Sequence, residues 1–483
     1  MVPQKISSKI GEHSKWTRSA KRKWFLVLLY GTCACYAART AMPLTVSAVS
    51  KMEAWNKKEA GTVLSSFFWG YTLTQVLGGY LSDRIGGDII LLIAGLAWSL
   101  ITFLHPQIIW IFSDHSWSVN TLCLFRVLMG ACQGVHFPAL ASISTRYLNE
   151  KQRAGFLATL MAGSSIGCLF TGTIGTFMLR TFGWPSVFYA VGVFSLAWLC
   201  IMHHVMKSSH PNRVVVVSVN EELLPVKPQS SRPSDAEPVP WKIYLLSPAV
   251  WASILSHTCA NYSWFLLLSW LPTYFYESFP GAEDWLFNVL PWLAHIPATI
   301  FVAKLSRWMI EKGVAVVTTR KIMECTCQFT QAILFYFITQ VNDFHIALLI
   351  MCIAVASNAF HVSGSVVNPQ DLAPKHAGSI YGLQNMAGAI PGFLGVYLAG
   401  FILETTKSWD MVFRLASIMS IFGWYIVWRC FLSRFKFVRE LLGTVSDGTP
   451  AEEHGVLDIP SKDIPNAHKG YCPNHNQLHL FHE

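Results

Sequence analysis

Apolar runs long enough to cross a lipid bilayer dominate this chain. The hydrocarbon core of a bilayer is about 30 Å thick, and a helix of about 20 apolar residues crosses it. Runs of that length recur about twelve times along the sequence, and charged residues gather between them. Hydrophobic residues make up 52% of the chain and charged residues only 13%, whereas a soluble domain carries about 25% charged residues. The sequence therefore predicts an all-α integral membrane protein.

The runs fall on either side of a polar segment rich in Pro and Ser, which is typical of a flexible linker. The first spanning helices are expected at about 24–49, 60–81, 89–112, 122–146, 155–179 and 184–205. The second group is expected at about 248–275, 285–310, 318–341, 344–367, 378–403 and 411–432. The predicted parts are a basic arm (1–23), a six-helix bundle (24–206), a linker (207–241), a second six-helix bundle (242–433) and a disordered tail (434–483).

The two halves of the chain share short motifs in the same order. Trp184-Pro-Ser-Val-Phe188 returns as Trp409-Asp-Met-Val-Phe413, and Lys151-Gln-Arg-Ala-Gly155 as Lys375-His-Ala-Gly378. Parallel six-helix repeats joined by a long central loop are typical of the major facilitator fold, which binds its substrate near the membrane midplane. The basic arm, linker and tail fall on one side of the predicted bundle, so the positive-inside rule places both termini in the cytosol. The net charge of +9 follows from this placement, and no nucleic-acid partner is expected.

Two arginines lie inside apolar runs. Arg39 is in the first predicted helix and Arg126 in the fourth, where a charge costs about 2.5–3.5 kcal/mol on insertion scales. The sequence shows no Asp or Glu at comparable depth, since acids such as Glu324 are placed at helix ends or in loops. Two hypotheses explain these buried charges. In the first, each arginine pairs with a buried carboxylate and only stabilises the helix bundle. In the second, which is favoured, the planar guanidinium groups bind an anionic substrate.

Other polar residues in the predicted helices are candidates to complete a substrate cavity. They are Tyr71, Gln75, Gln133, Tyr262, Asn358 and Asn385. Hydrogen bonds between helices are the alternative role for each, because such bonds are common in membrane bundles. Asp83 and Arg84, in a turn after the second helix, are expected to form a latch between helix ends rather than to contact substrate.

Metal and catalytic chemistry are not indicated. Most of the 12 cysteines lie in apolar runs without the spacing of a metal site, which favours small packing residues. His136 and His361 could carry protons, although packed neutral histidines are the expectation. Cys472, His475, His479 and His482 in the tail could bind a soft metal, but a solvated tail is favoured. A phosphate-binding loop with its Lys is absent, which argues against a nucleotide hydrolase; no enzyme and no metal are expected.

Several motifs resemble the organic-anion branch of the major facilitators, which includes vesicular glutamate, sialic acid, phosphate and nucleotide transporters. The motifs are residues 65–75, 126–134, 183–189 and 370–374. Within the branch, residues 55–61, 268–274 and 285–292 are most similar to the nucleotide transporters. The resemblance runs from about Trp24 to Leu432 and spares the arm, linker and tail.

This resemblance implies uptake of ATP, ADP and GTP into secretory vesicles or lysosomes, by alternating access in a monomeric unit that spans the lipid bilayer. It implies that membrane potential drives uptake, that chloride activates it without any other cofactor, and that Arg126 is essential. The glutamate-transporter pattern has a histidine at Leu64, a glutamate at Gln133 and an arginine at Ala260. Their absence argues against glutamate and against obligate proton symport. A phosphate or small organic-anion symporter, or a non-transporting receptor, remains the alternative.

Overall fold

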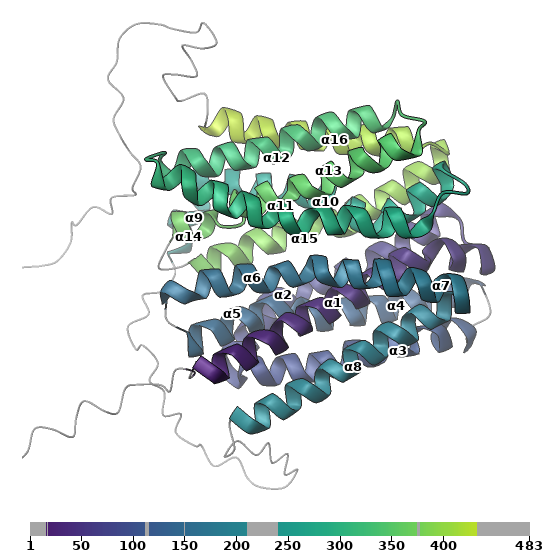
Figure 1. Cartoon of the computed structure of the whole chain (residues 1–483), viewed down its shortest axis with the longest axis horizontal. Coiled ribbons are helices and arrows are strands. Elements are labelled where there is room, and N and C mark those ends of the chain that lie inside the picture. The colour runs from purple at the N-terminus through teal and green to yellow at the C-terminus, as the bar shows by residue number, and fades with distance from the viewer. Residues whose placement is uncertain are drawn as a thin grey trace, which may run out of the picture. The chain divides into compact units, whose positions relative to one another are not determined.

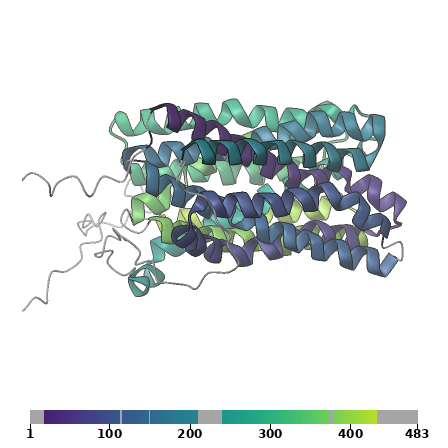
Figure 2. The same ribbon diagram turned by 90° about the horizontal axis from the view of Figure 1, so that it is seen from below.

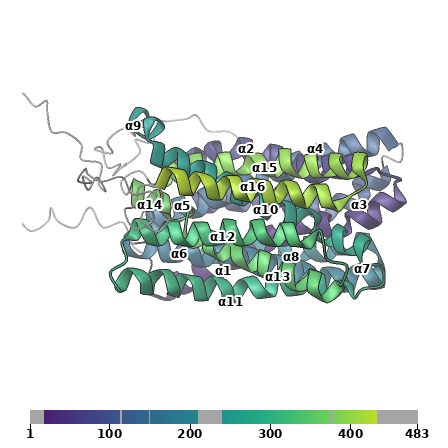
Figure 3. The same cartoon turned by 90° about the horizontal axis from the view of Figure 1, so that it is seen from above.

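The computed structural model of the chain describes Trp16 and residues 18–111, 115–148, 150–209, 240–373 and 377–431. Within these ranges the structure is helical, without strands. Most of the predicted arm, linker and tail, including the histidines of the tail, lies outside the described residues. The long helices run along one common direction (Figure 1), and the two views turned from it, Figure 2 and Figure 3, show the same arrangement.

The first half of the fold contains six spanning segments. They are α1 (Arg18–Met52), α2 (Lys57–Ile85), α3 (Gly87–Ile111), α4 (His115–Gly134) with α5 (His136–Tyr147), α6 (Glu150–Phe170) with the π-helix η1 (Thr171–Gly175) and α7 (Thr176–Phe182), and α8 (Trp184–Ser209).

The second half of the fold also contains six segments. Its segments are α10 (Pro248–Ser278), α11 (Asp284–Glu311), α12 (Val316–Ile338), α13 (Phe344–Ser363) with the short α14 (Asn368–Leu372), α15 (Ala377–Thr406) and α16 (Trp409–Phe431). A one-and-a-half-turn helix, α9 (Trp241–Leu246), precedes them. Eight of the segments in the described ranges are long and apolar enough to span a membrane by length and composition. The predicted all-α membrane fold with twelve spanning segments is confirmed.

Two predicted helices are interrupted. The fourth breaks at Val135, between α4 and α5, because Pro138 has no N–H to donate to the preceding turn. The fifth contains the π-helix η1, a feature that is frequent at functional sites. A Cβ atom on Gly172 of η1 would lie 2.0 Å from the carbonyl oxygen of Asn288 in α11. The π-helix therefore brings the first half of the fold into backbone contact with the second.

The two halves are joined by polar contacts at one end of the helices, here called the Lys57 end. Lys57 begins α2 and forms an ion pair with Glu277 at the end of α10. Its backbone N–H donates to Glu404 of α15 at 2.9 Å, and Lys51 of α1 donates to the hydroxyl of Tyr276 at 2.6 Å. These contacts close the interface between the halves at the Lys57 end.

The opposite end, where α2 finishes, is here called the Arg84 end. The hydrogen bonds of the described side chains that join α1–α8 to α10–α16 lie at the Lys57 end or in the middle of the helices, as between Ser165 of α6 and His295 of α11 at 2.8 Å. Nearest to the Arg84 end is the one between Asn385 of α15 and Gln75 of α2. The described side chains thus close the Lys57 end.

Candidate functional site

Arg126 is held where α4 and α2 pack backbone to backbone. A Cβ atom on Gly130 would lie 1.8 Å from the carbonyl oxygen of Phe67, and one on Gly70 would lie 1.9 Å from that of Val127. Only residues without side chains permit this approach. The glycines that the sequence places one and two turns after Arg126 therefore serve the contact between helices, which fixes the arginine against α2.

Arg126 is 2% exposed. Its Nε donates to the carbonyl oxygen of Val63 at 3.4 Å and its Nη1 lies 3.9 Å from the sulfur of Met129. Its guanidinium carbon lies 5.2 Å from the centre of the Phe67 ring. Among the described residues no carboxylate forms an ion pair with it, so the positive charge is met only by weak dipoles and an aromatic face.

Arg39 of α1 is also 2% exposed and is surrounded by aromatic rings. Its guanidinium carbon lies 4.5 Å from the ring centre of Tyr36, 4.8 Å from that of Phe67 and 4.7 Å from that of Tyr71. Its Nε donates to Oε1 of Gln133 at 3.4 Å. The Nη2 of Arg39 and the Nε2 of Gln133 are buried without a hydrogen-bond partner in the described structure.

Phe67 links the two arginines. The guanidinium carbons of Arg39 and Arg126 both lie within 5.2 Å of the centre of its ring. The two carbons are therefore at most about 10 Å apart. The sequence prediction did not include Phe67, although its position one turn before Tyr71 places it on the same face of α2. Two buried cations and two unpaired buried donors form a site that an anion with several oxygens can satisfy.

The structure brings only some of the predicted cavity residues to the arginines. Tyr71 and Gln133 contact Arg39 directly. Gln75 and Asn385 instead bond to each other across the two halves. Tyr262 is buried with an unpaired hydroxyl, and Asn358 is buried in α13, but none of their described contacts involves Arg39 or Arg126.

The expectation that no carboxylate lies at depth is wrong. Glu324 of α12 is only 2% exposed and accepts hydrogen bonds from Ser256 at 2.8 Å and from His361 at 2.9 Å. The sequence suggested a helix end because α12 begins only two turns earlier, at Val316. Burial arises because α10 and α13 cover this face of α12. Glu324 belongs to the second half and has no described contact with Arg39 or Arg126.

The predicted latch is not seen in the described contacts of Arg84, whose guanidinium carbon lies 4.6 Å from the ring centre of Tyr80 on its own helix. The side chain of Asp83 lies outside the described residues. In the second half, an arginine of α12 joins the helix ends. Arg320 donates to Asp371 of α14 at 2.8 Å and to Ser306 of α11 at 3.1 Å.

His136 packs against Thr32 with a hydrogen bond of 3.1 Å. The described cysteines are free thiols, and the described residues contain no group of three His, Cys, Asp or Glu side chains that could hold a metal ion.

Comparison with known proteins places the chain in a family. The model of the Major Facilitator Superfamily matches residues 25–396, and that of a domain of unknown function matches residues 408–450. The mouse voltage-gated purine nucleotide uniporter SLC17A9 is 40% identical over 87% of this chain and 92% of its own length, and the human protein is 39% identical over 87% and 94%. The rice protein named probable anion transporter 4, chloroplastic, is 33% identical over 87% of this chain and 70% of its own length.

A solved structure with the same fold is a bacterial homolog of the human lysosomal transporter Spinster, in an inward-facing and occupied conformation. It has a TM-score of 0.64 and 13% identity, and the match covers 88% of this chain and 99% of that one. Family members are transporters and not enzymes, which confirms that expectation. The chain therefore belongs to the Major Facilitator Superfamily, in the organic-anion branch that contains the SLC17A9 nucleotide transporters and the plant anion transporters.

Proposed function

We propose that this protein transports purine nucleotides such as ATP, ADP and GTP across an organelle membrane, with Arg39 and Arg126 binding the phosphates. The observation that carries the proposal is the pair of buried arginines around Phe67, without a described carboxylate partner. A polyphosphate has oxygens enough to engage both guanidinium groups. The relatives named as purine nucleotide uniporters support the same substrate class.

The base of the nucleotide is expected to contribute less than its phosphates. Tyr71 already packs on Arg39, so stacking of the base would extend an aromatic cluster rather than occupy a separate pocket. Base stacking on an aromatic side chain is worth about 1–3 kcal/mol, which gives preferences among purines without strict exclusion. Gln75, Gln133, Tyr262, Asn358 and Asn385 are proposed to shape the cavity as the halves move.

Alternating access fits the contacts between the halves. We assign the Lys57 end to the organelle lumen and the Arg84 end, with both termini, to the cytosol, as the charge distribution favours. The closed Lys57 end then corresponds to a cytosol-facing state. Asp83 and Arg84 are proposed to latch helix ends when the cytosolic side closes. A monomer is the proposed transport unit, and secretory vesicles or lysosomes are the proposed location.

Membrane potential is the proposed driving force. A lumen-positive potential favours entry of a polyanion by about 2.3 kcal/mol per charge per 100 mV, so an ATP anion needs no coupled cation. Chloride is proposed as an activating ion, because Arg39 has a buried N–H without a partner. Uptake of labelled ATP by the purified protein in liposomes, under a potassium diffusion potential and with chloride replaced by gluconate, tests both statements.

The decisive experiment compares Arg126→Ala and Arg126→Lys with the wild type in such liposomes. Both variants are expected to lose uptake, since Lys cannot form the bidentate contact with phosphate. Arg307→Gln is the matched control, because Arg307 is exposed on α11. Near-normal uptake by Arg126→Lys would contradict the phosphate-binding role.

Competition with unlabelled anions tests the substrate class. ATP, ADP and GTP are expected to compete and glutamate is not. Strong competition by phosphate or a small organic anion, with GTP inactive, would support the alternative of a small-anion symporter. A protein that moves no anion under any gradient would support a receptor.

A further inference from the structure

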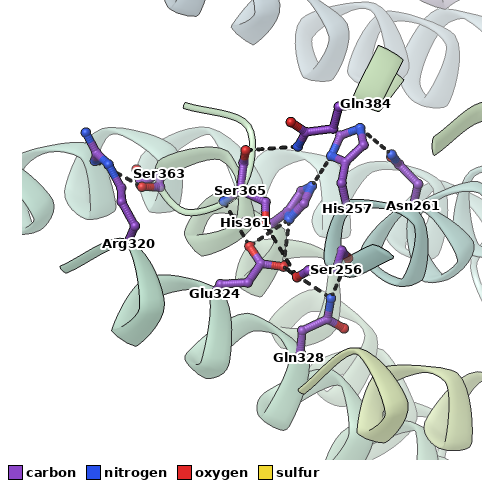
Figure 4. Close-up of polar contacts among 10 residues, drawn as sticks. All are labelled: Ser256, His257, Asn261, Arg320, Glu324, Gln328, His361, Ser363, Ser365 and Gln384. Atoms are coloured by element: carbon purple, nitrogen blue, oxygen red, sulfur yellow. Dashed lines mark hydrogen bonds and ion pairs between the residues drawn. The ribbon is translucent and has the colours of Figure 1, made fainter. Parts of the chain in front are cut away.

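A chain of four hydrogen-bonded side chains crosses the interior of the second half, away from the two arginines (Figure 4). Nδ1 of His361 lies 2.9 Å from Oε2 of Glu324, and Nε2 of His361 lies 2.9 Å from Nδ1 of His257. Nε2 of His257 lies 2.8 Å from Nδ2 of Asn261. The acid and both histidines are at most 4% exposed. A carboxylate and two histidines buried together at membrane depth are costly and mark a functional site by default.

The carboxylate of Glu324 is surrounded by donors. Besides the imidazole of His361, it accepts hydrogen bonds from the hydroxyl of Ser256 at 2.8 Å, the amide of Gln328 at 3.2 Å and the backbone N–H of Ser365 at 3.1 Å. Hydrogen bonds to a carboxylate favour its ionised form. A proton that enters the chain therefore resides on the histidines, opposite a fixed negative charge.

The hydrogen-bonded chain can form all of its hydrogen bonds in two protonation states. With neutral histidines, Asn261 donates to His257, His257 to His361 and His361 to Glu324, which leaves one net negative charge. With one more proton, His361 donates from both nitrogens, to Glu324 and to His257, and His257 donates to the amide oxygen of Asn261 after a flip of that amide. The second state forms a Glu324–His361 ion pair with no net charge, which removes an uncompensated buried anion.

A small pocket gives Glu324 a route to the cytosolic side. It has a volume of about 40 Å³, is lined by Ser256, Glu324 and Ser365, and reaches Val317 and Asn368 near the start of α12 and α14. Val317 is 46% exposed. A water molecule needs about 10–15 Å³ of such volume, so the pocket accommodates a short file of waters through which a proton can pass.

The other titratable groups around the chain come from each neighbouring helix. Arg320 is paired with Asp371 of α14; Lys321 lines the pocket from α12. Thiols of α12 and α10 lie within electrostatic range of Glu324, namely Cys325, Cys327 and Cys259. The acids of α15 and α16 with described contacts, Glu404 and Asp410, lie toward the Lys57 end. Among the side chains that contact the Glu324 carboxylate directly, the imidazole of His361 is thus the one that can take up a proton and form an ion pair with it.

The hydrogen-bonded chain also contacts α15, a helix that lies at the interface between the two halves. Gln384 of α15 donates to the carbonyl oxygen of Ser365, in the turn held by Glu324, at 2.9 Å. One turn further, a Cβ atom on Gly388 would lie 2.5 Å from Nδ2 of Asn261. Asn385, next to Gln384, bonds to Gln75 of the other half. The protonation state of the chain is thus linked to the helix that contacts both halves.

We propose that Glu324, His361 and His257 form a proton-binding site that regulates the transport cycle. The proposal rests on the transport function proposed above. Proton binding forms the Glu324–His361 ion pair and holds the turn at Ser365 against α15, which stabilises the cytosol-facing state that loads substrate. Loss of the proton leaves the carboxylate uncompensated and loosens that turn. The proton regulates the rate, while membrane potential remains the driving force.

The test measures ATP uptake in liposomes at fixed voltage, with the same pH on both sides, from pH 5.5 to 8. Wild-type uptake is expected to fall as pH rises, by up to tenfold per pH unit, which is the limiting slope for one proton. Glu324→Gln is expected to make uptake independent of pH, because a neutral amide can neither form the ion pair nor be left as an uncompensated charge. Glu324→Asp is expected to restore the dependence, and His361→Gln to abolish it.

The matched control is His105→Gln. His105 is a buried histidine of α3 whose Nδ1 bonds to a backbone carbonyl of its own helix, so the wild-type pH profile is expected to persist. A Glu324→Gln profile that matches the wild type, or a flattened profile in His105→Gln, would overturn the proposal.

A second readout does not depend on transport. The melting temperature in detergent is expected to fall as pH rises for the wild type, because loss of the proton leaves the buried carboxylate of Glu324 without a positive partner. Glu324→Gln is expected to lose that part of the dependence. If no anion is transported but this difference is observed, the nucleotide function fails and the proton site stands. Equal pH dependence in both proteins overturns the proton site, whatever the uptake shows.

Discussion

Gly130→Ala is expected to disrupt the site without touching either arginine. Gly130 lies in α4, where it faces the backbone of α2. The new Cβ would lie 1.8 Å from the carbonyl oxygen of Phe67, 2.9 Å from its carbonyl carbon and 3.0 Å from the backbone nitrogen of Tyr71. All three neighbours are backbone atoms, so no side-chain rotation relieves the contact. The two helices must separate.

The required shift follows from these distances. Ordinary contact begins at 3.4 Å, so the oxygen of Phe67 must withdraw by about 1.6 Å. Overpacking of this kind costs about 1–3 kcal/mol of stability. Because Phe67 carries both guanidinium contacts, the same shift displaces the aromatic ring between Arg39 and Arg126. A misplacement of about 1 Å in a site can lower a rate about 100-fold, so uptake is expected to fall by at least tenfold.

Thermal unfolding in detergent and ATP uptake in liposomes measure the two effects. Gly79→Ala, in the partner helix α2, is the control, because its Cβ would lie 3.7 Å from its nearest neighbour, the Cβ of Pro138, and so fits without strain. It is expected to retain wild-type uptake and an equal or higher melting temperature, since Ala is the better helix former. A Gly130→Ala variant with wild-type melting temperature and uptake would refute the close packing of α2 on α4 as the element that positions the site.

Two further variants test separate contacts. Gln133→Glu places a carboxylate 3.4 Å from Nε of Arg39. Because this carboxylate would compete with phosphate for a charged hydrogen bond worth about 1.5–3 kcal/mol, ATP uptake at subsaturating concentration is expected to fall about 10- to 100-fold. Unchanged uptake would show that Arg39 does not bind substrate. Arg320→Gln removes the hydrogen bonds to Asp371, Ser306 and the carbonyl oxygen of Ser363. It is expected to lower the free energy of unfolding by about 1–3 kcal/mol. Arg307→Gln serves as the control in thermal unfolding, and equal melting temperatures for the two variants would contradict a stabilising role of the Arg320–Asp371 ion pair.

The sequence by itself determined the membrane-spanning class, the number of spanning segments and the depth of the two arginines. Helix lengths follow from the thickness of the bilayer, and a charge inside an apolar run is recognisable without any tertiary contact. The breaks at Val135 and in η1 were not predicted, because hydropathy registers an apolar run whether or not its backbone is continuous. Pro138 was the one local signal for the first break.

Tertiary structure decided which polar side chains meet. Gln75 and Asn385 come from helices far apart in sequence, and their mutual bond depends on the packing of α15 on α2. Glu324 resembles a helix-end acid in the sequence, yet the neighbouring α10 and α13 bury it beside two histidines. Spacing along one helix shows which residues share a face, but the partner of that face is set by how the helices pack. The depth of the two arginines could therefore be predicted from the sequence, while the buried acid and its hydrogen-bonded histidines required the fold.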